Sequence, residues 1–335
     1  MIRKTLAYLA ASTLVILFLP ACKTGKSAPA TEMVVQYADS IQAISLIQEN
    51  DRDGFFDLIQ VTDMAIQMHA LPPYPDRAIM LEKYKAFLAG QVKPMEPKDK
   101  IWLDSTFLLV KKGIKDLNPK LAPPAINIVK IRTDHYGEGT FYTRGYTIFI
   151  PDHIFSENFR EHVDVMYHEL WHIISRNNKD IKTKAYQLIG FEPHGKSLKL
   201  PDSLQQLILT NPDGCVNDYA LNLKGETIIP IIHSKYRAYN PMLKEFFEYL
   251  SFDFFPIDEQ GRVGNDPAKL GSMEGLYDKI KDNTQYIIHP DEIMADNFRM
   301  CINSNQSGDY SMYSTGGKQL IQDFTQLLKE VKKVD

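Results

Sequence analysis

The sequence predicts an α+β fold that is predominantly helical and contains one small sheet. Apolar residues recur at helical spacing through most of residues 33–120. A period of two, with β-branched and aromatic residues, then predicts strands over residues 126–132 and 146–150. From residue 182 to residue 333 the pattern returns to helices and long loops. We therefore expect a lobe of helices and sheet up to about residue 180, followed by a helical lobe.

Apolar residues, glycines and prolines place the first helices and turns. Ile41, Ile44 and Ile47 follow a helical repeat, and a longer repeat covers residues 101–117. The stretch 51–54 (Asp-Arg-Asp-Gly) hints at a calcium loop, but the glycine comes too early and the later ligands are missing. It therefore predicts a turn between two helices. Later elements are predicted in the same way: a turn at 211–214 and helices at 241–249 and 317–331.

The N-terminus carries the features of an export signal. Arg3 and Lys4 precede an apolar run over residues 5–19, which is too short to span a bilayer comfortably. The run ends in Leu-Pro-Ala-Cys at residues 19–22, which resembles the lipobox of bacterial lipoproteins.

The lipobox resemblance implies how the protein is processed and where it resides. Residues 1–21 would be removed as a signal peptide, Cys22 would carry the lipid, and residues 22–32 would form a flexible tether. The protein would then be an exported bacterial lipoprotein. A lysine rather than an acidic residue follows the cysteine, so we expect the outer membrane. A plain secretory signal with an incidental cysteine is the alternative.

Composition and charge exclude some classes of partner. The chain has a formal net charge of -4 and no basic run outside the N-terminal segment, so we expect no nucleic-acid partner. No later segment is long and apolar enough to cross a membrane, which leaves the N-terminal lipid as the expected membrane contact. Cys215 and Cys301 could form a disulfide or remain two separate buried thiols, and the second is favoured.

Residues 165–174 carry the chemically most informative pattern, His-Glu-x-x-His. His168 and His172 are four residues apart, so on a helix they share one face and can present two imidazoles to one metal ion. Glu169 leans over the same site, where a carboxylate can take a proton from a water molecule. The alternative is that the two histidines are ordinary polar residues beside a core stripe.

Capping residues and an apolar stripe predict the extent of this helix. Asn158, with Glu161 three residues on, predicts a start with reciprocal capping. Residues 177–178 (Asn-Asn) predict a left-handed stop. The stripe at helical spacing consists of Val163, Met166, Tyr167, Leu170, Ile173 and Ile174.

The order of a sheet followed by this helix resembles the N-terminal lobe of the zincin metallopeptidases. The resemblance implies that residues 33–335 form one zincin-like domain. In those enzymes an edge strand beside the helix pairs with the extended substrate backbone. Residues 142–146 are the candidate for that strand, and a buried structural strand is the alternative.

Two histidines do not complete a zinc site, because a third protein ligand is needed. Ser175 and Asn178 stand where the metzincin pattern requires glycine and histidine. The chain resembles instead the gluzincins, which take a glutamate from a later helix and an aspartate four residues after it. Glu192 lies 20 residues after His172, but Lys196 occupies the place of the aspartate.

Glu292 is the chosen third ligand. It follows Pro290, which suits a first helical position, and it precedes Asp296 at the required spacing. The resemblance implies that Asp296 accepts the other ring N–H of His168. Glu292 lies 120 residues after His172, which implies a helical insertion between the ligands. The alternative is an exposed acidic stripe that includes Glu292, Asp296, Arg299 and Asn303.

The resemblance implies a zinc-dependent metallopeptidase acting on a peptide or protein substrate. His168, His172 and Glu292 would hold Zn²⁺, and Glu169 would be the catalytic base. The oxyanion needs a further donor, commonly a tyrosine or histidine in such enzymes. The candidates are Tyr286 and His289, which lie near Glu292 in the sequence, followed by Tyr219 and His233.

Two other functions stay open at this point. One is a zinc amidase that acts on a small or cell-wall substrate. The other is a lipoprotein that binds a partner or ligand without catalysis.

Overall fold

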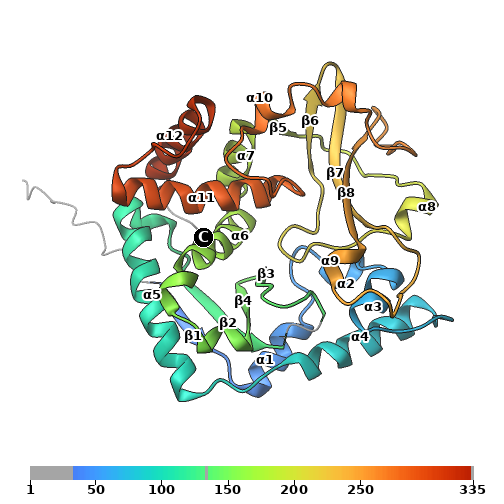
Figure 1. Cartoon of the computed structure of the whole chain (residues 1–335), viewed down its shortest axis with the longest axis horizontal. Helices are drawn as coiled ribbons and strands as arrows, with labels where there is room; N and C mark the ends of the chain where they lie inside the picture. Colours follow the sequence, from blue (N-terminus) through green and yellow to red (C-terminus); the bar gives the residue numbers. More distant parts are fainter. Residues whose placement is uncertain (1–32, 133–134, 333–335) are drawn as a thin grey trace, which may run out of the picture. The chain divides into compact units, whose positions relative to one another are not determined.

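Helices and two four-stranded sheets make up the part of the chain that the computed structural model describes, residues 33–132 and 135–332 (Figure 1). The predicted α+β class is confirmed. The α-helices are α1 (Ser40–Gln48), α2 (Phe55–Leu58), α3 (Val61–Gln67), α4 (Arg77–Gln91), α5 (Pro97–Leu117), α6 (Val163–Asn177), α7 (Lys179–Leu188), α8 (Asp202–Gln205), α9 (Phe246–Tyr249), α10 (Leu276–Ile280), α11 (Pro290–Ser307) and α12 (Thr315–Glu330). The 3-10 helices are η1 (Pro119–Leu121), η2 (Asp152–Ser156), η3 (Phe159–His162) and η4 (Leu270–Met273).

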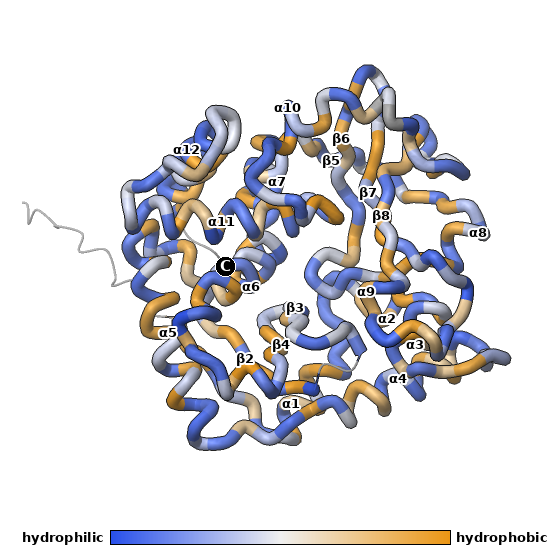
Figure 2. Tube along the Cα trace, viewed as in Figure 1, coloured by the Kyte–Doolittle hydropathy of each residue, from blue (hydrophilic) through white to orange (hydrophobic). Residues whose placement is uncertain are grey.

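The first sheet has the strand order β1-β2-β4-β3. Its strands are β1 (Val34–Tyr37), β2 (Ala125–Ile131), β3 (Tyr142–Arg144) and β4 (Thr147–Pro151). β1, β2 and β4 are parallel, whereas β3 is an antiparallel edge strand. Ile128 and Ile148 lie in the core that contains α5 and α6, while Val129 and Phe149 lie in the core of α1 to α4. Both faces are therefore covered, and hydrophobic colour runs along much of β2 (Figure 2).

The sequence predictions for this half are largely confirmed. β2 and β4 match the predicted strands, and residues 33–120 are mostly helical. The turn predicted at 51–54 separates α1 from α2 and places Gly54 at φ 72°, in the left-handed region that favours glycine. The prediction missed β1, because this four-residue strand pairs with β2, which lies almost ninety residues later.

The second sheet corrects the expectation of helices and loops after residue 182. It is an antiparallel meander of β5 (Phe191–Pro193), β6 (Tyr219–Leu223), β7 (Glu226–Ser234) and β8 (Leu250–Pro256). β7 contains Pro230, a residue that normally argues against an internal strand. The hairpin between β6 and β7 uses Lys224 and Gly225, both with positive φ, as a tight hairpin turn requires. The helix predicted at 241–249 is wrong apart from the single turn α9, whereas α12 confirms the last predicted helix.

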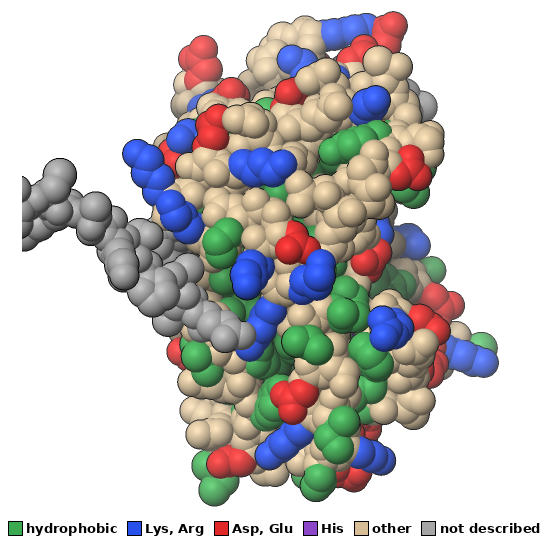
Figure 3. All heavy atoms as spheres, turned by 90° about the vertical axis from the view of Figure 1, so that its left-hand side faces the viewer, with side chains coloured by type: hydrophobic (Ala, Val, Ile, Leu, Met, Phe, Trp, Pro, Cys, Tyr) green, Lys and Arg blue, Asp and Glu red, His purple; other side chains and the backbone are tan. Residues whose placement is uncertain are grey.

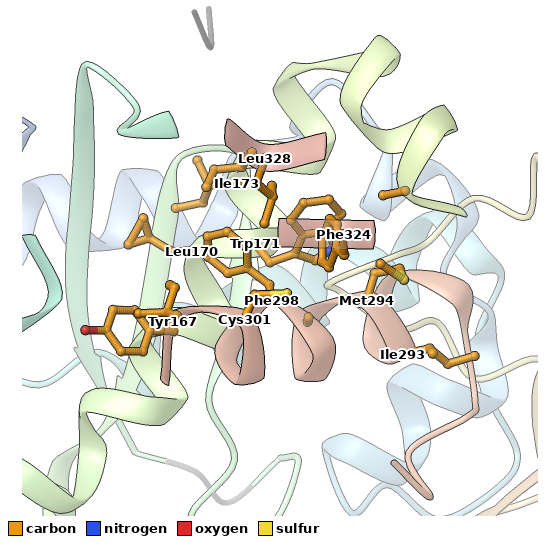
Figure 4. Packing of buried hydrophobic residues seen from close by; sticks show 14 of the residues in the cluster. Tyr167, Leu170, Trp171, Ile173, Ile293, Met294, Phe298, Cys301, Phe324 and Leu328 are labelled. Atoms are coloured by element: carbon orange, nitrogen blue, oxygen red, sulfur yellow. The ribbon is translucent and has the colours of Figure 1, made fainter. Parts of the chain in front are cut away.

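The helices α6, α11 and α12 form the core behind the predicted site (Figure 4). Tyr167, Leu170, Trp171 and Ile173 of α6 point into it. The residues that meet them are Ile293, Met294, Phe298 and Cys301 of α11 and Phe324 and Leu328 of α12. The predicted stripe of α6 is therefore its packing face, which leaves the adjacent face for polar residues.

The predicted ends of the α6 helix need small corrections. Asn158 caps a turn as expected, but that turn is η3, and α6 begins at Val163. The helix ends at Asn177, as predicted. Asn178 is not left-handed: its φ of -136° is extended, and its side chain caps α7. The cap of the next helix therefore decides the conformation of Asn178.

Several expectations concern cysteines, membranes and charge. Cys215 and Cys301 are free thiols, as favoured from the sequence. The signal peptide, the tether and Cys22 lie outside the described residues. Within the described ranges, no helix combines the length and apolar composition needed to cross a membrane. On the face shown in Figure 3, acidic and basic side chains are interspersed.

Gly113 allows α5 to approach α6 and α11 closely. A Cβ atom at this position would overlap the Tyr167 hydroxyl and lie 2.9 Å from Cγ2 of Ile302. Tyr167 in turn donates a hydrogen bond to the backbone carbonyl of Leu109, which holds α6 against α5. Glycine is therefore required here by packing rather than by backbone conformation.

We predict that Gly113→Ala lowers the free energy of unfolding by about 1–3 kcal/mol, because overpacking displaces Tyr167. The matched control is Gly90→Ala in α4, where nothing lies within 4 Å of the added atom. In the control, the free energy of unfolding rises by about 0.5–1 kcal/mol, because alanine suits a helix better than glycine. Urea denaturation measures both values, and equal effects in the two variants would contradict the packing argument.

Candidate metal centre

α6 directs its polar face toward a cleft of about 530 Å³. His168 and Glu169 line this cleft, and His172 lies behind them, fully buried. The rings of His168 and His172 have centroids 4.9 Å apart. The helical spacing that suggested one shared face is therefore realised in three dimensions.

Glu292 comes to the two imidazoles from the first turn of α11. Its Oε2 atom lies 3.1 Å from Nε2 of His168 and 3.5 Å from Nε2 of His172. The predicted convergence of the three side chains is confirmed, and they form a group that can hold a metal ion. The exposed-stripe alternative is wrong for Glu292, whose side chain is 1% exposed. Glu192 lies in β5, exposed and bonded to Gln187.

The two separations from Glu292 Oε2 fit a small divalent cation. Ligands about 2.0–2.1 Å from a tetrahedral ion are about 3.3–3.4 Å apart, close to the separations from Glu292. Nε2 of His172 is also buried without a hydrogen-bond partner among the described residues. Proteins rarely leave such an atom unpaired, and a metal bond would satisfy it. These side chains therefore fit a zinc-sized ion.

His168 and Glu292 stabilise each other's charged forms, so an ion that binds here must displace a proton from the imidazole. Burial alone would lower the pKa of His168, but hydrogen bonds to Asp296 and Glu292 outweigh it and raise that pKa well above its usual value. Burial would by itself raise the pKa of the Glu292 carboxyl group, but the neighbouring His172 and His168 side chains lower that pKa below its usual value. Glu292 is therefore held as a carboxylate, the form that binds metals.

Each imidazole ring has a carboxylate beside its Nδ1 atom, and this carboxylate fixes the orientation of the ring. Asp296 lies 3.3 Å from Nδ1 of His168, as predicted, and Asp291 lies 2.9 Å from Nδ1 of His172. Each ring therefore directs Nε2 toward Glu292. Asp291 was missed because the gluzincin pattern specifies only the aspartate after the glutamate. The acidic residue directly before Glu292 was the available signal.

Asp291 is the more firmly held of the two aspartates. It accepts hydrogen bonds from Trp171 Nε1, the Tyr186 hydroxyl and the Ser175 hydroxyl, at 2.8–3.1 Å. Burial would raise its pKa, but the hydrogen bond and charge of His172 lower it well below the usual range. Asp291 is therefore a fixed negative charge behind His172.

Glu169 is held by the edge strand of the first sheet. The hydroxyl of Thr143 in β3 donates to Oε2 of Glu169 at 2.6 Å, and Glu169 is 3% exposed. The prediction that a strand lies beside this helix is therefore confirmed. Thr143 was missed as a site residue, because nothing in its local sequence relates it to Glu169.

A loop at residues 211–214 adds two further polar residues. Asn211 donates to Oε1 of Glu292 at 2.6 Å. Asp213 offers a carboxylate oxygen within 4.8 Å of ligand atoms of Glu169 and His172. Burial raises the pKa of Asp213 well above its usual value; His172 opposes the shift, and Glu169 and Glu292 add to it. The sequence predicted a turn here but gave no sign that it reaches the site.

Arg176 ties this loop to β3 and corrects the expectation about substrate pairing. The Thr143 amide donates to Asp213, and the Thr143 carbonyl accepts from Arg176. The same guanidinium nitrogen donates to the carbonyls of Pro212 and Asp213. The outward backbone groups of Thr143 are thus already bonded. A substrate strand therefore cannot pair with β3 at this position.

The candidate oxyanion donors lie in different places. Tyr286 lines the cleft, with its ring centroid 6.3 Å from that of His168. His289 instead caps α11 by accepting the Asp291 amide, and it lines a different cavity. Tyr219 is bonded to Thr183, and His233 is paired with Asp253. Tyr286 alone of the four candidates lines the cleft together with His168 and Glu169.

Comparison with known proteins adds no assignment: no family model, no curated protein and no solved structure matches this chain. The geometry of the side chains therefore carries the functional argument.

We predict that Asp291→Asn weakens metal binding by about 10- to 100-fold, because the carboxylate that orients His172 is lost. Competition with a chromogenic chelator measures the affinity, with Asp309→Asn in the exposed loop after α11 as the control. Unchanged affinity in Asp291→Asn would show that this carboxylate does not support the metal centre.

Proposed function

We propose that this protein is a zinc-dependent metallopeptidase of the gluzincin type. The observation that carries the proposal is the convergence of His168, His172 and Glu292 in a cleft that also presents Glu169. A purely structural ion needs no carboxylate base beside it, whereas a hydrolase does. The cleft supports an extended substrate, since exposed residues such as Glu161 and Phe247 lie along its rim.

The chain's own groups divide the work of hydrolysis. Zinc, when held by the three ligands, supplies a Lewis acid that polarises the carbonyl and makes water more acidic. Glu169 takes a proton from the attacking water and passes it to the leaving amine. The Thr143 hydroxyl keeps the Glu169 carboxylate in place during both transfers. The Tyr286 hydroxyl donates to the oxygen that becomes negative.

We predict that Glu169→Gln retains zinc but loses peptide hydrolysis by about 10²- to 10⁴-fold in kcat. The amide keeps the shape of the side chain and can still accept from Thr143, but it cannot take a proton. Zinc content is measured in the same preparations as hydrolysis of a mixed peptide library. Glu192→Gln, which changes the rejected ligand candidate in β5, is the matched control and retains both properties.

Three results would contradict the proposal. A zinc-loaded Glu169→Gln variant with full activity would remove Glu169 from its role. Hydrolysis of small or cell-wall amides but of no peptide would make the protein an amidase. A wild-type protein that binds no zinc, and whose ligand binding survives His168→Ala, would be a binding lipoprotein.

We also propose that the protein is exported and anchored at the outer membrane by a lipid on Cys22. The proposal is supported by the charged start, the apolar run and the lipobox-like residues 19–22. Cys22 itself lies outside the described residues.

We predict that Cys22→Ala moves the protein from the detergent-soluble membrane fraction to the aqueous fraction. A fatty-acid label would be incorporated by the wild type and not by the variant. A wild type without label, or a variant that stays with the membranes, would refute lipid anchoring at this residue.

A further inference from the structure

A small apolar side pocket opens off the metal cleft. Its volume is about 60 Å³, and five residues line both spaces: Thr140, Phe141, Asp213, Phe247 and Tyr286. The side-pocket walls that do not line the metal cleft include Leu209, Ile232 and Leu250. A cavity of about 150 Å³ holds a benzene ring, so this pocket suits an aliphatic side chain better than an aromatic one.

The loop that carries Asp213 bounds the cleft next to the metal ligands. Asp213 and Arg176 occupy the outward amide and carbonyl of Thr143, so a bound peptide cannot continue along β3. Residues 138–141, directly before β3, line the cleft and remain beside its open part. This boundary favours a substrate whose chain ends near the metal over one that passes through.

The charge of this boundary indicates which end of a peptide it accepts. Five carboxyl groups surround the two imidazoles: those of Glu169, Asp213 and Glu292 lie toward the cleft, and those of Asp291 and Asp296 lie behind the rings. Arg299 is the only Lys or Arg among the described residues that line the cleft, and it is paired with Asp164 and Asp296. A cationic amine is therefore favoured at Asp213, and a carboxylate terminus is disfavoured.

Asp213 lies at a distance from the metal ligands that suits binding of the amine of the residue that is cleaved off. In an N-terminal residue, the amine nitrogen lies about 2.5 Å from its own carbonyl carbon. The group recognised must therefore lie close to the metal ligands. The Asp213 carboxylate does so, within 4.8 Å of ligand atoms of His172 and Glu169.

We propose that the protein is an aminopeptidase: Asp213 binds the free α-amino group of a peptide, and the side pocket takes an aliphatic side chain of the first residue. This proposal rests on the proposed metallopeptidase function. Water adds across the first peptide bond, so that a C–O bond forms and the C–N bond breaks. The proton goes through Glu169 to the new amine, and the products are one amino acid and a peptide shortened by one residue.

The test uses the zinc-loaded full chain and four peptides with one common tail. They begin with leucine, N-acetyl-leucine, aspartate and tryptophan. Values of kcat/KM are measured, and products are identified by mass spectrometry. The variants are Asp213→Asn, its control Asp218→Asn at an exposed residue directly before β6, and Phe247→Ala, which widens the pocket at a half-exposed residue.

We expect release of free leucine, with acetylation lowering kcat/KM at least tenfold in the wild type and in Asp218→Asn. For Asp213→Asn, the values of kcat/KM for the free and the acetylated peptide differ little. Leucine is preferred over aspartate and tryptophan, and Phe247→Ala improves cleavage of the tryptophan peptide. Calorimetry with zinc-loaded Glu169→Gln provides a second measurement, in which the free peptide binds more tightly than the acetylated one.

The failures can be told apart. Equal cleavage of free and acetylated peptides, internal cleavage, or an unchanged preference in Asp213→Asn overturns the aminopeptidase proposal while the metallopeptidase function stands. Absence of hydrolysis of every peptide, or hydrolysis that Glu169→Gln leaves intact, overturns both.

Discussion

Trp171 of α6 packs against Phe298 of α11 and Phe324 of α12, with ring centroids 5.5 and 5.1 Å apart. All three rings are buried. Aromatic contacts of this kind add about 0.5–1.5 kcal/mol each to the stabilisation from buried area. Since the histidines lie on α6 and Glu292 begins α11, this packing fixes the separation between ligands that lie 120 residues apart in the chain. The same contact places Asp291 and Asp296 behind the two rings.

The candidate metal centre concentrates ionisable side chains in the protein interior, where burying a charge costs free energy. The folded protein offsets that cost with hydrogen bonds whose donors come from several elements. Asp291 receives four from α6 and α7, Glu292 receives one from Asn211, and Glu169 receives one from Thr143. Each carboxylate is therefore oriented before any ion arrives, which reduces the reorganisation needed on binding.

The parts of this site that could be predicted from the sequence are those whose residues lie a few positions apart on one helix or strand. Helical spacing places His168, Glu169 and His172 on one helix and Glu292 with Asp296 on another, and the structure brings the two together. The strands β2 and β4 were predictable for the same reason. Thr143, Asn211 and Asp213 could not be found this way, because their roles depend on a loop meeting an edge strand far away in sequence. The second sheet was missed because Pro230 interrupts the pattern of β7.

The most direct test of the account is a crystal structure of the zinc-loaded protein with anomalous data collected at the zinc edge. The account predicts one strong peak at about 2.0–2.2 Å from Nε2 of His168, Nε2 of His172 and a carboxylate oxygen of Glu292. A peak at other residues, or a structure in which Glu292 stays hydrogen-bonded to His168 in the presence of excess zinc, would contradict it.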